Sequence, residues 1–175
     1  MNKVSRLALA AGVCLLSSAP ALAIDPPTKV RLFHFADGDT QTAYVDFGSL
    51  DRSDVVYGWT YHVYDPPKTF TGLDQPVGSY WERIGGDCDT GSVVSYGIVA
   101  LDTSQTVIFD QVDENAPVRR DAAPNSFDEA LLNRVCGGAE PTDAAPFTST
   151  KEAEDTVRLG NQLDDYFGLG DDSGD

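Results

Sequence analysis

Basic residues are scarce in this chain, which has 12 Lys+Arg against 28 Asp+Glu and a formal net charge of −16. A protein that binds nucleic acid needs a basic surface that displaces counterions from the phosphates. Anionic lipid headgroups likewise repel an acidic surface. The charge balance therefore excludes nucleic acid as an expected partner and disfavours attachment to an anionic membrane surface.

Catalytic and metal-binding motifs are also missing from the sequence. It has no G-x-S-x-G nucleophile elbow, no H-E-x-x-H zinc motif and no Cys/His nucleophile arrangement. The ordered ligand spacing of a calcium-binding loop is absent as well. We therefore expect a non-enzymatic protein with no catalytic residue, no metal site and no cofactor.

Histidine is limited to His34 and His62, and both lie in predicted strands. As haem or metal ligands they would have to face one pocket together, whereas packing or solvation on a sheet explains them without a ligand. Turn formation explains the acids that flank predicted turns, namely Asp37, Asp39, Asp87 and Asp89. We interpret both sets as structural.

Long apolar runs are absent from most of the chain. An apolar stretch near the N-terminus, residues 7–16, follows two basic residues. It is too short to span a bilayer, which takes about 20 residues. The tripeptide Ala-Leu-Ala at 21–23 then places small residues where signal peptidase reads them. We expect residues 1–23 to be a cleaved signal peptide, which leaves a periplasmic or secreted protein with no membrane insertion.

Cysteine is rare, with three residues in the chain. Cys14 lies inside the apolar stretch and follows Val13, whereas a lipobox has a small residue directly before a cysteine that ends the stretch. We therefore expect Cys14 to leave with the signal peptide and the mature protein to carry no lipid. Cys88 and Cys136 remain, and such a pair in an exported chain predicts a disulfide because the compartment is oxidising. A metal site or a redox-active pair is disfavoured because C-x-x-C spacing and a nearby histidine are lacking.

Short segments rich in β-branched and aromatic residues predict a sheet. The predicted strands cover residues 29–35, 42–47, 55–64, 79–84, 92–101 and 106–112. The connections are too short for parallel crossovers, so an antiparallel sheet of about six short strands follows.

One helix is predicted after the strands, over residues 127–135. Ser126 and Glu129 fit a capping box, and Gly137-Gly138 ends the apolar pattern. A helix packed on an antiparallel sheet, and tied to it through the disulfide, is an α+β fold.

We place the folded domain at residues 24–138 and an acidic linker and tail at residues 139–175. Ser149 and Glu152 lie in capping-box register, so residues 149–167 are compatible with a weak helix. The strand series and the first helix end before this segment. We therefore expect it to be dispensable for the fold.

The strand at 55–64 carries an aromatic stripe, Tyr57, Trp59 and Tyr61, on one face. Tyr and Trp combine a large apolar area with a polar group and are favoured at interfaces. The stripe is the best binding candidate. The alternative is that this face covers the helix at 127–135, because a sheet must bury one face.

Several short motifs resemble the surface-adhesin protein E family of small exported bacterial proteins. They extend over roughly residues 29–138, and the cysteine placement and the helix motif are the most specific of them. The motifs are Tyr44-Val45-Asp46 with Ser49-Leu50, Tyr64, Ser79-Tyr80, Asp87-Cys88, Tyr96, and Pro124-x-Ser126 leading to Leu132 and Val135-Cys136.

The resemblance implies an antiparallel sheet that carries one helix and is held by a disulfide. Members of the family bind host and matrix proteins and haem, and they are often lipid-anchored, which the missing lipobox does not match. The resulting hypothesis is a non-enzymatic exported binding protein with protein partners. The alternative is a carrier of a small apolar ligand such as haem in the periplasm. A homodimer is compatible with both.

Overall fold

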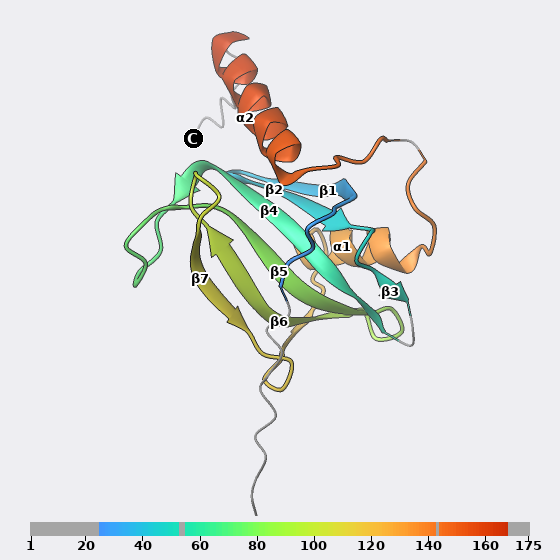
Figure 1. Ribbon diagram of the computed structural model, residues 1–175. Helices are drawn as coiled ribbons and strands as arrows, with labels where there is room; N and C mark the ends of the chain where they lie inside the picture. The colour runs from blue at the N-terminus through green and yellow to red at the C-terminus, as the bar shows by residue number, and fades with distance from the viewer. Residues whose placement is uncertain (1–24, 53–54, 143, 168–175) are drawn as a thin grey trace, which may run out of the picture.

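The computed structural model describes residues 25–52, 55–142 and 144–167, which form an antiparallel sheet and two helices (Figure 1). The predicted signal peptide lies outside these residues. The strands are β1 Leu32–Gly38, β2 Gln41–Asp46, β3 Asp51–Arg52, β4 Val56–Lys68, β5 Val77–Asp87, β6 Ser92–Leu101, β7 Val107–Val112 and β8 Val118–Asp121, and the helices are α1 Phe127–Cys136 and α2 Thr150–Phe167.

The sheet has eight strands in the order β1-β2-β4-β5-β6-β7, with β3 paired to β4 and β8 paired to β6. All of these pairs are antiparallel, as predicted. The predicted number of about six strands is too low. The two missed strands, β3 and β8, are short and polar and show no alternation of apolar residues.

Strand β6 changes partner halfway along its length. Its residues from Gly97 onward pair with β7, whereas Ser92–Ser95 pair with β8. Gly97 has φ +127°, and a Cβ there would lie 1.8 Å from the carbonyl oxygen of Gln111, so glycine is required. A register shift between Arg83 and Ile84 of β5 lies opposite this point. Such an irregularity bends the strands.

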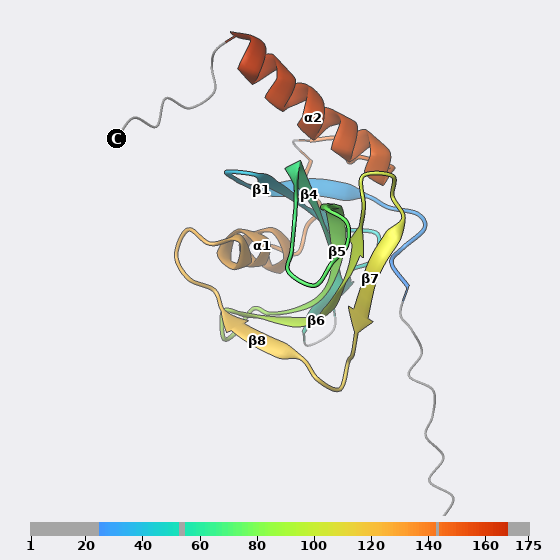
Figure 2. The same ribbon diagram turned by 90° about the vertical axis from the view of Figure 1, so that its left-hand side faces the viewer.

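Helix α1 lies in the hollow of the bent sheet, between β1 and β8 (Figure 2). Its buried residues Leu131, Leu132 and Val135 pack on one face of the sheet. The cap is as predicted, because Ser126 Oγ accepts a hydrogen bond from the backbone nitrogen of Glu129 at 3.2 Å. The Glu129 carboxylate accepts from the backbone nitrogen of Asn125 at 2.7 Å.

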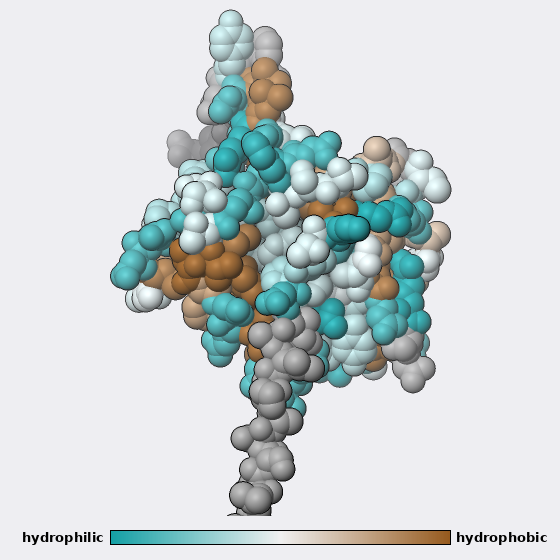
Figure 3. All heavy atoms as spheres, in the orientation of Figure 1, coloured by the Kyte–Doolittle hydropathy of each residue, from teal (hydrophilic) through white to brown (hydrophobic). Residues whose placement is uncertain are grey.

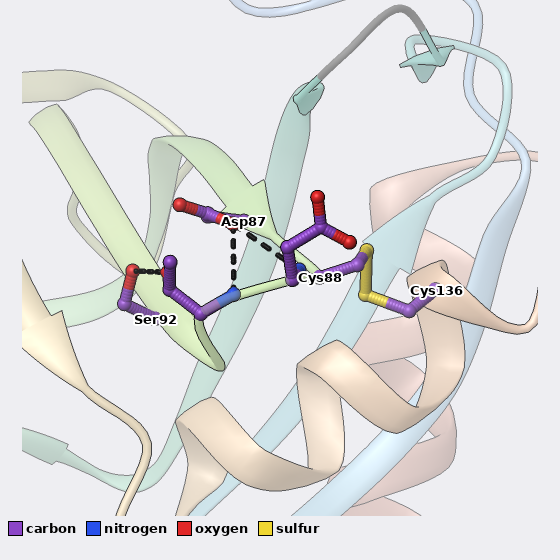
Figure 4. Close-up of a disulfide and its surroundings, with 6 residues drawn as sticks. Asp87, Cys88, Ser92 and Cys136 are labelled. Carbon is purple, nitrogen blue, oxygen red and sulfur yellow. Dashed lines mark hydrogen bonds between the residues drawn. A yellow bond between two sulfur atoms is a disulfide. The ribbon is translucent and has the colours of Figure 1, made fainter.

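The predicted disulfide between Cys88 and Cys136 is present and ties α1 to the sheet. Cys88 follows β5 and Cys136 ends α1, with 5.7 Å between their Cα atoms (Figure 4). The turn that carries Cys88 is held by Asp87, whose carboxylate accepts from the backbone nitrogens of Asp89 and Thr90 at 3.2 and 3.0 Å. This turn role of Asp87 agrees with its structural interpretation.

The segment after Gly138 returns to the sheet. The backbone of Phe147 exchanges two hydrogen bonds of 3.0 Å with Leu32 of β1. Ala153 of α2 is fully buried in the core cluster that contains Trp59 and Tyr61. The helix expected at 149–167 is therefore present as α2, and its first turns belong to the core. No helix in the described ranges is long and apolar enough to cross a membrane.

Candidate ligand-binding site

A cavity of about 730 Å³ lies between the sheet and the start of α1. Small-molecule sites commonly have volumes of roughly 300–1,000 Å³. The walls are mostly apolar and aromatic. Nineteen residues line it, Phe35, Gln41, His62, Tyr64, Phe70, Thr71, Gly72, Leu73, Val77, Tyr80, Glu82, Ile98, Ala100, Phe109, Arg120, Ser126, Phe127, Asp128 and Leu131.

The loop between β4 and β5 forms one wall of the cavity. It turns back on itself, since the backbone nitrogen of Leu73 donates to the carbonyl of Phe70 at 3.2 Å. The Phe70 ring lies 5.9 Å from the ring of Tyr64. The ammonium group of Lys68 lies 5.4 Å from the centroid of each of these two rings. Close by, hydrophobic residues gather on the surface over β7 (Figure 3), the strand that carries Phe109.

His62 occupies the floor of the cavity because strand register places it there. β4 and β5 pair His62 directly with Tyr80, and their rings stack with centroids 4.4 Å apart at an interplanar angle of 3°. The amide nitrogen of Gln41 lies 2.7 Å from His62 Nδ1 and donates to the hydroxyl of Tyr80 at 3.1 Å. Because the amide nitrogen only donates, Nδ1 accepts, and Nε2 donates its proton to Thr60 Oγ1 at 2.9 Å.

Burial also fixes the protonation states on this floor. Desolvation lowers the pKa of His62 to about 4, so the imidazole is neutral at pH 7. Desolvation raises the pKa values of Tyr64 and Tyr80, so both phenols keep their protons. The two phenols therefore offer neutral hydrogen-bonding groups to a ligand, and His62 contributes a neutral aromatic ring.

An ion-pair network closes the end of the cavity nearest α1. Arg120 of β8 donates from Nη1 to Glu82 Oε1 of β5, and from Nε and Nη2 to the two carboxylate oxygens of Asp128 on α1, each at 2.9 Å. Paired donors of this kind are among the strong protein hydrogen bonds. The hydrogen bond to Asp128 is the largest cause that raises the pKa of Arg120. The network ties α1 to two strands.

Two polar residues of the lining are already engaged in hydrogen bonds within the protein. Ser126, a hydroxyl residue of the wall, already caps α1. The neutral His62 directs its one N–H to Thr60. In the part of the chain that the structure describes, no group of three or more His, Cys, Asp or Glu residues is placed to hold a metal ion.

The predicted binding stripe lies elsewhere, on the opposite face of the sheet. Trp59 and Tyr61 are buried and pack on Trp81, at centroid distances of 6.3 and 4.7 Å. The Tyr61 hydroxyl donates to Glu154 of α2. The alternative interpretation, that this face covers the helix at 127–135, is wrong because α1 packs on the other face. The third stripe residue, Tyr57, lies half-buried beside Tyr96.

The two histidines do not meet. His34 is exposed beside Asp37, with Nε2 2.8 Å from a carboxylate oxygen, and it does not line the cavity. The sequence analysis considered His62 only as a haem or metal ligand. It did not assign the alternate positions His62 and Tyr64 of β4, or Tyr80 and Glu82 of β5, to a binding site. A signal was present, because these aromatic and polar residues recur at spacing two on one strand face.

Comparisons with known proteins add little to this geometry. No protein-family model matches the chain, and no curated protein matches it. Among solved structures, the crystal structure of protein E from non-typeable Haemophilus influenzae is similar, with a TM-score of 0.44 and 10% sequence identity. The match covers 79% of this chain and 97% of that chain.

Proposed function

We propose that this protein is a non-enzymatic exported binding protein that holds a small, mostly apolar molecule between its sheet and α1. The observation that supports this proposal is the cavity of about 730 Å³ with its aromatic walls. Protein interiors are normally close-packed, with few voids larger than a water molecule. A sheet face and a helix that leave such a space suit a guest molecule.

The attachment of α1 to the sheet at both of its ends supports the same proposal. Its last residue is tied to the turn after β5 by the disulfide, and Asp128 in its first turn is tied to β8 by Arg120. The helix is thus held at both ends while the space beside it stays open. The disulfide also supports export, because such bonds persist in oxidising compartments.

A dye titration tests the proposal. The neutral apolar dye N-phenyl-1-naphthylamine should show saturable fluorescence enhancement with the mature protein. Ile98 lines the cavity and pairs across the sheet with Glu82. Ile98→Trp should fill the space and weaken dye binding by about tenfold or more, equivalent to about 1.4 kcal/mol.

The matched control is Val107→Trp, because Val107 is exposed on β7 and does not line the cavity. It should leave dye binding unchanged, and both variants should show the circular dichroism spectrum of the wild type. The proposal is wrong if the wild type gives no saturable signal, or if the two variants bind the dye equally well.

A second candidate function, association with a protein partner, is favoured by one observation on α2. Beyond its buried first turns, the helix exposes Leu159, Leu163 and Tyr166, and hydrophobic surface is visible on it in Figure 3. Because the chain has a net charge of −16, two copies repel each other, and a second copy is disfavoured as the partner. We therefore expect the protein to be a monomer in sedimentation velocity. A dimer that Leu163→Glu dissociates would instead identify this stripe as a self-association surface.

A further inference from the structure

We propose that the molecule bound in the cavity is an amine, with an apolar or aromatic body and a protonated amino group facing Glu82. This inference rests on the proposed function, because it names the ligand class of the same cavity.

The polar end of the cavity has more acidic than basic groups. The ionisable residues that line it are His62, Tyr64, Tyr80, Glu82, Arg120 and Asp128. Since the histidine and both tyrosines are neutral at pH 7, two carboxylates face a single guanidinium. These three groups sum to a net charge of about −1, which favours a cation beside Glu82. The ammonium group of Lys68 lies farther along β4, beside Tyr64 and Phe70.

The two carboxylate oxygens of Glu82 differ in their hydrogen bonding. Oε1 accepts a hydrogen bond from Arg120 at 2.9 Å. Oε2 lies 3.9 Å from His62 Nε2, whose proton goes to Thr60 instead, and no hydrogen bond between described residues uses Oε2. The Glu82 side chain is 11% exposed. Because Glu82 lines the cavity, this oxygen is open to a donor that enters the cavity, and a ligand N–H would satisfy it.

The aromatic walls of the cavity also favour a cation. Ring faces of Tyr and Phe attract cations within about 6 Å of the centroid. At the edge of the cavity, the Lys68 ammonium already lies 5.4 Å from the centroids of Tyr64 and Phe70. The chain's own amine therefore shows that this ring pair accepts a cation, and Tyr80 and Phe127 present further rings inside.

An anionic headgroup is disfavoured in the same position. Arg120 directs three hydrogen bonds to Glu82 and Asp128, so its charge is already compensated. The N-terminus of α1, which attracts anions in other proteins, carries Asp128 and Glu129 in its first turn. A carboxylate guest would meet acids on both sides.

A matched ligand series tests the inference on the wild-type protein. 1-Pyrenemethylamine, 1-pyrenemethanol and 1-pyrenecarboxylic acid share one fluorescent body and differ in the charge of the headgroup. The amine should bind about tenfold or more tighter than the acid, with the alcohol between them. The amine inference is overturned if the alcohol or the acid binds as tightly as the amine.

Two variants then locate the preference. Glu82→Gln removes the charge and should reduce amine affinity by about fivefold or more while the alcohol changes by less than about twofold. Asp110→Asn is the control, because Asp110 is exposed on β7, does not line the cavity and removes the same net charge. Equal losses in the two variants would contradict the role of Glu82.

The outcomes separate the two proposals. If none of the three pyrene compounds binds and the naphthylamine dye also fails, the cavity is not a ligand site and the proposed function falls. If all three bind equally and Ile98→Trp removes them, the cavity is a ligand site and only the amine inference falls.

Discussion

His62 is a buried base whose two ring nitrogens are both hydrogen-bonded to neutral groups, Gln41 and Thr60. A charged imidazole would gain little there, because burial is the largest cause of its lowered pKa. The residue therefore works as a flat neutral ring against Tyr80, and it contributes shape to the cavity floor rather than charge.

Its folded-state pKa of about 4, against 6.5 for the ordinary side chain, predicts a pH-dependent stability. Between these values the unfolded chain binds a proton on this ring and the folded chain does not, so the free energy of unfolding falls as pH falls. We expect a loss of about 2 kcal/mol between pH 7.5 and pH 5 from this group. Below pH 4 both states are protonated and the dependence ends.

Urea unfolding of the wild type and of His62→Gln at the two pH values measures this contribution. Titration of the carboxylates is common to both proteins and cancels in the comparison. The wild type should lose more stability than the variant on acidification, by the stated amount. Equal losses would contradict a depressed pKa at this residue.

At the scale of elements, α2 is held to the sheet by its first turns. Glu154 is 4% exposed, and its carboxylate accepts hydrogen bonds from Tyr61 and Gln105. Arg158 lies 3.4 Å from the same carboxylate. Further along the helix, Leu159 is exposed. The helix is thus divided into an anchored part and an outer part.

Two truncations test this division. Ending the chain after Gly138 removes Phe147 and Ala153 from the core cluster and uncovers Tyr61, so the thermal midpoint should fall by roughly 5 °C or more. Ending it after Arg158 removes only the outer part of α2 and should leave the midpoint nearly unchanged. Differential scanning calorimetry measures both. A midpoint unchanged by the first cut would support the predicted domain boundary at Gly138.

Local signals explain which elements the sequence predicts well. The α1 helix is capped by Ser126 and is followed by Gly137-Gly138. The long strand β4 is rich in β-branched and aromatic residues. These features act within a few residues of the chain. The antiparallel sheet, α1 and the disulfide could therefore be predicted.

Contacts between distant segments explain what was missed. The buried residues of α2 are a small Ala153 and a charged Glu154, which have no hydrophobic signature before their partner Tyr61 is known. Arg120 joins the cavity because a short polar strand, β8, pairs with β6 beyond its bulge. Neither the volume of the cavity nor its open carboxylate oxygen on Glu82 is a property of any single segment.

At the scale of the whole molecule, the shape of the cavity depends on the position of α1 relative to the sheet. The disulfide closes a loop with a sequence separation of 48 residues. In the chain-entropy model a loop of this length stabilises the folded state by about 4 kcal/mol. At the other end of the helix the Arg120–Asp128 pair is part-exposed and screened, so the disulfide is the stronger of the two ties.

Removing the disulfide should therefore damage stability and binding together. We expect the double variant Cys88→Ser/Cys136→Ser to lose about 4 kcal/mol of unfolding free energy in urea. At a temperature where circular dichroism shows it folded, its affinity for the naphthylamine dye should fall, because the last turn of α1 is free to move away from the sheet. Arg120→Gln is the companion variant, since it loosens the first turn and leaves the disulfide intact. If the folded double variant binds the dye with wild-type affinity, the packing of Leu131, Leu132 and Val135 alone positions the helix, and the disulfide serves stability without shaping the cavity.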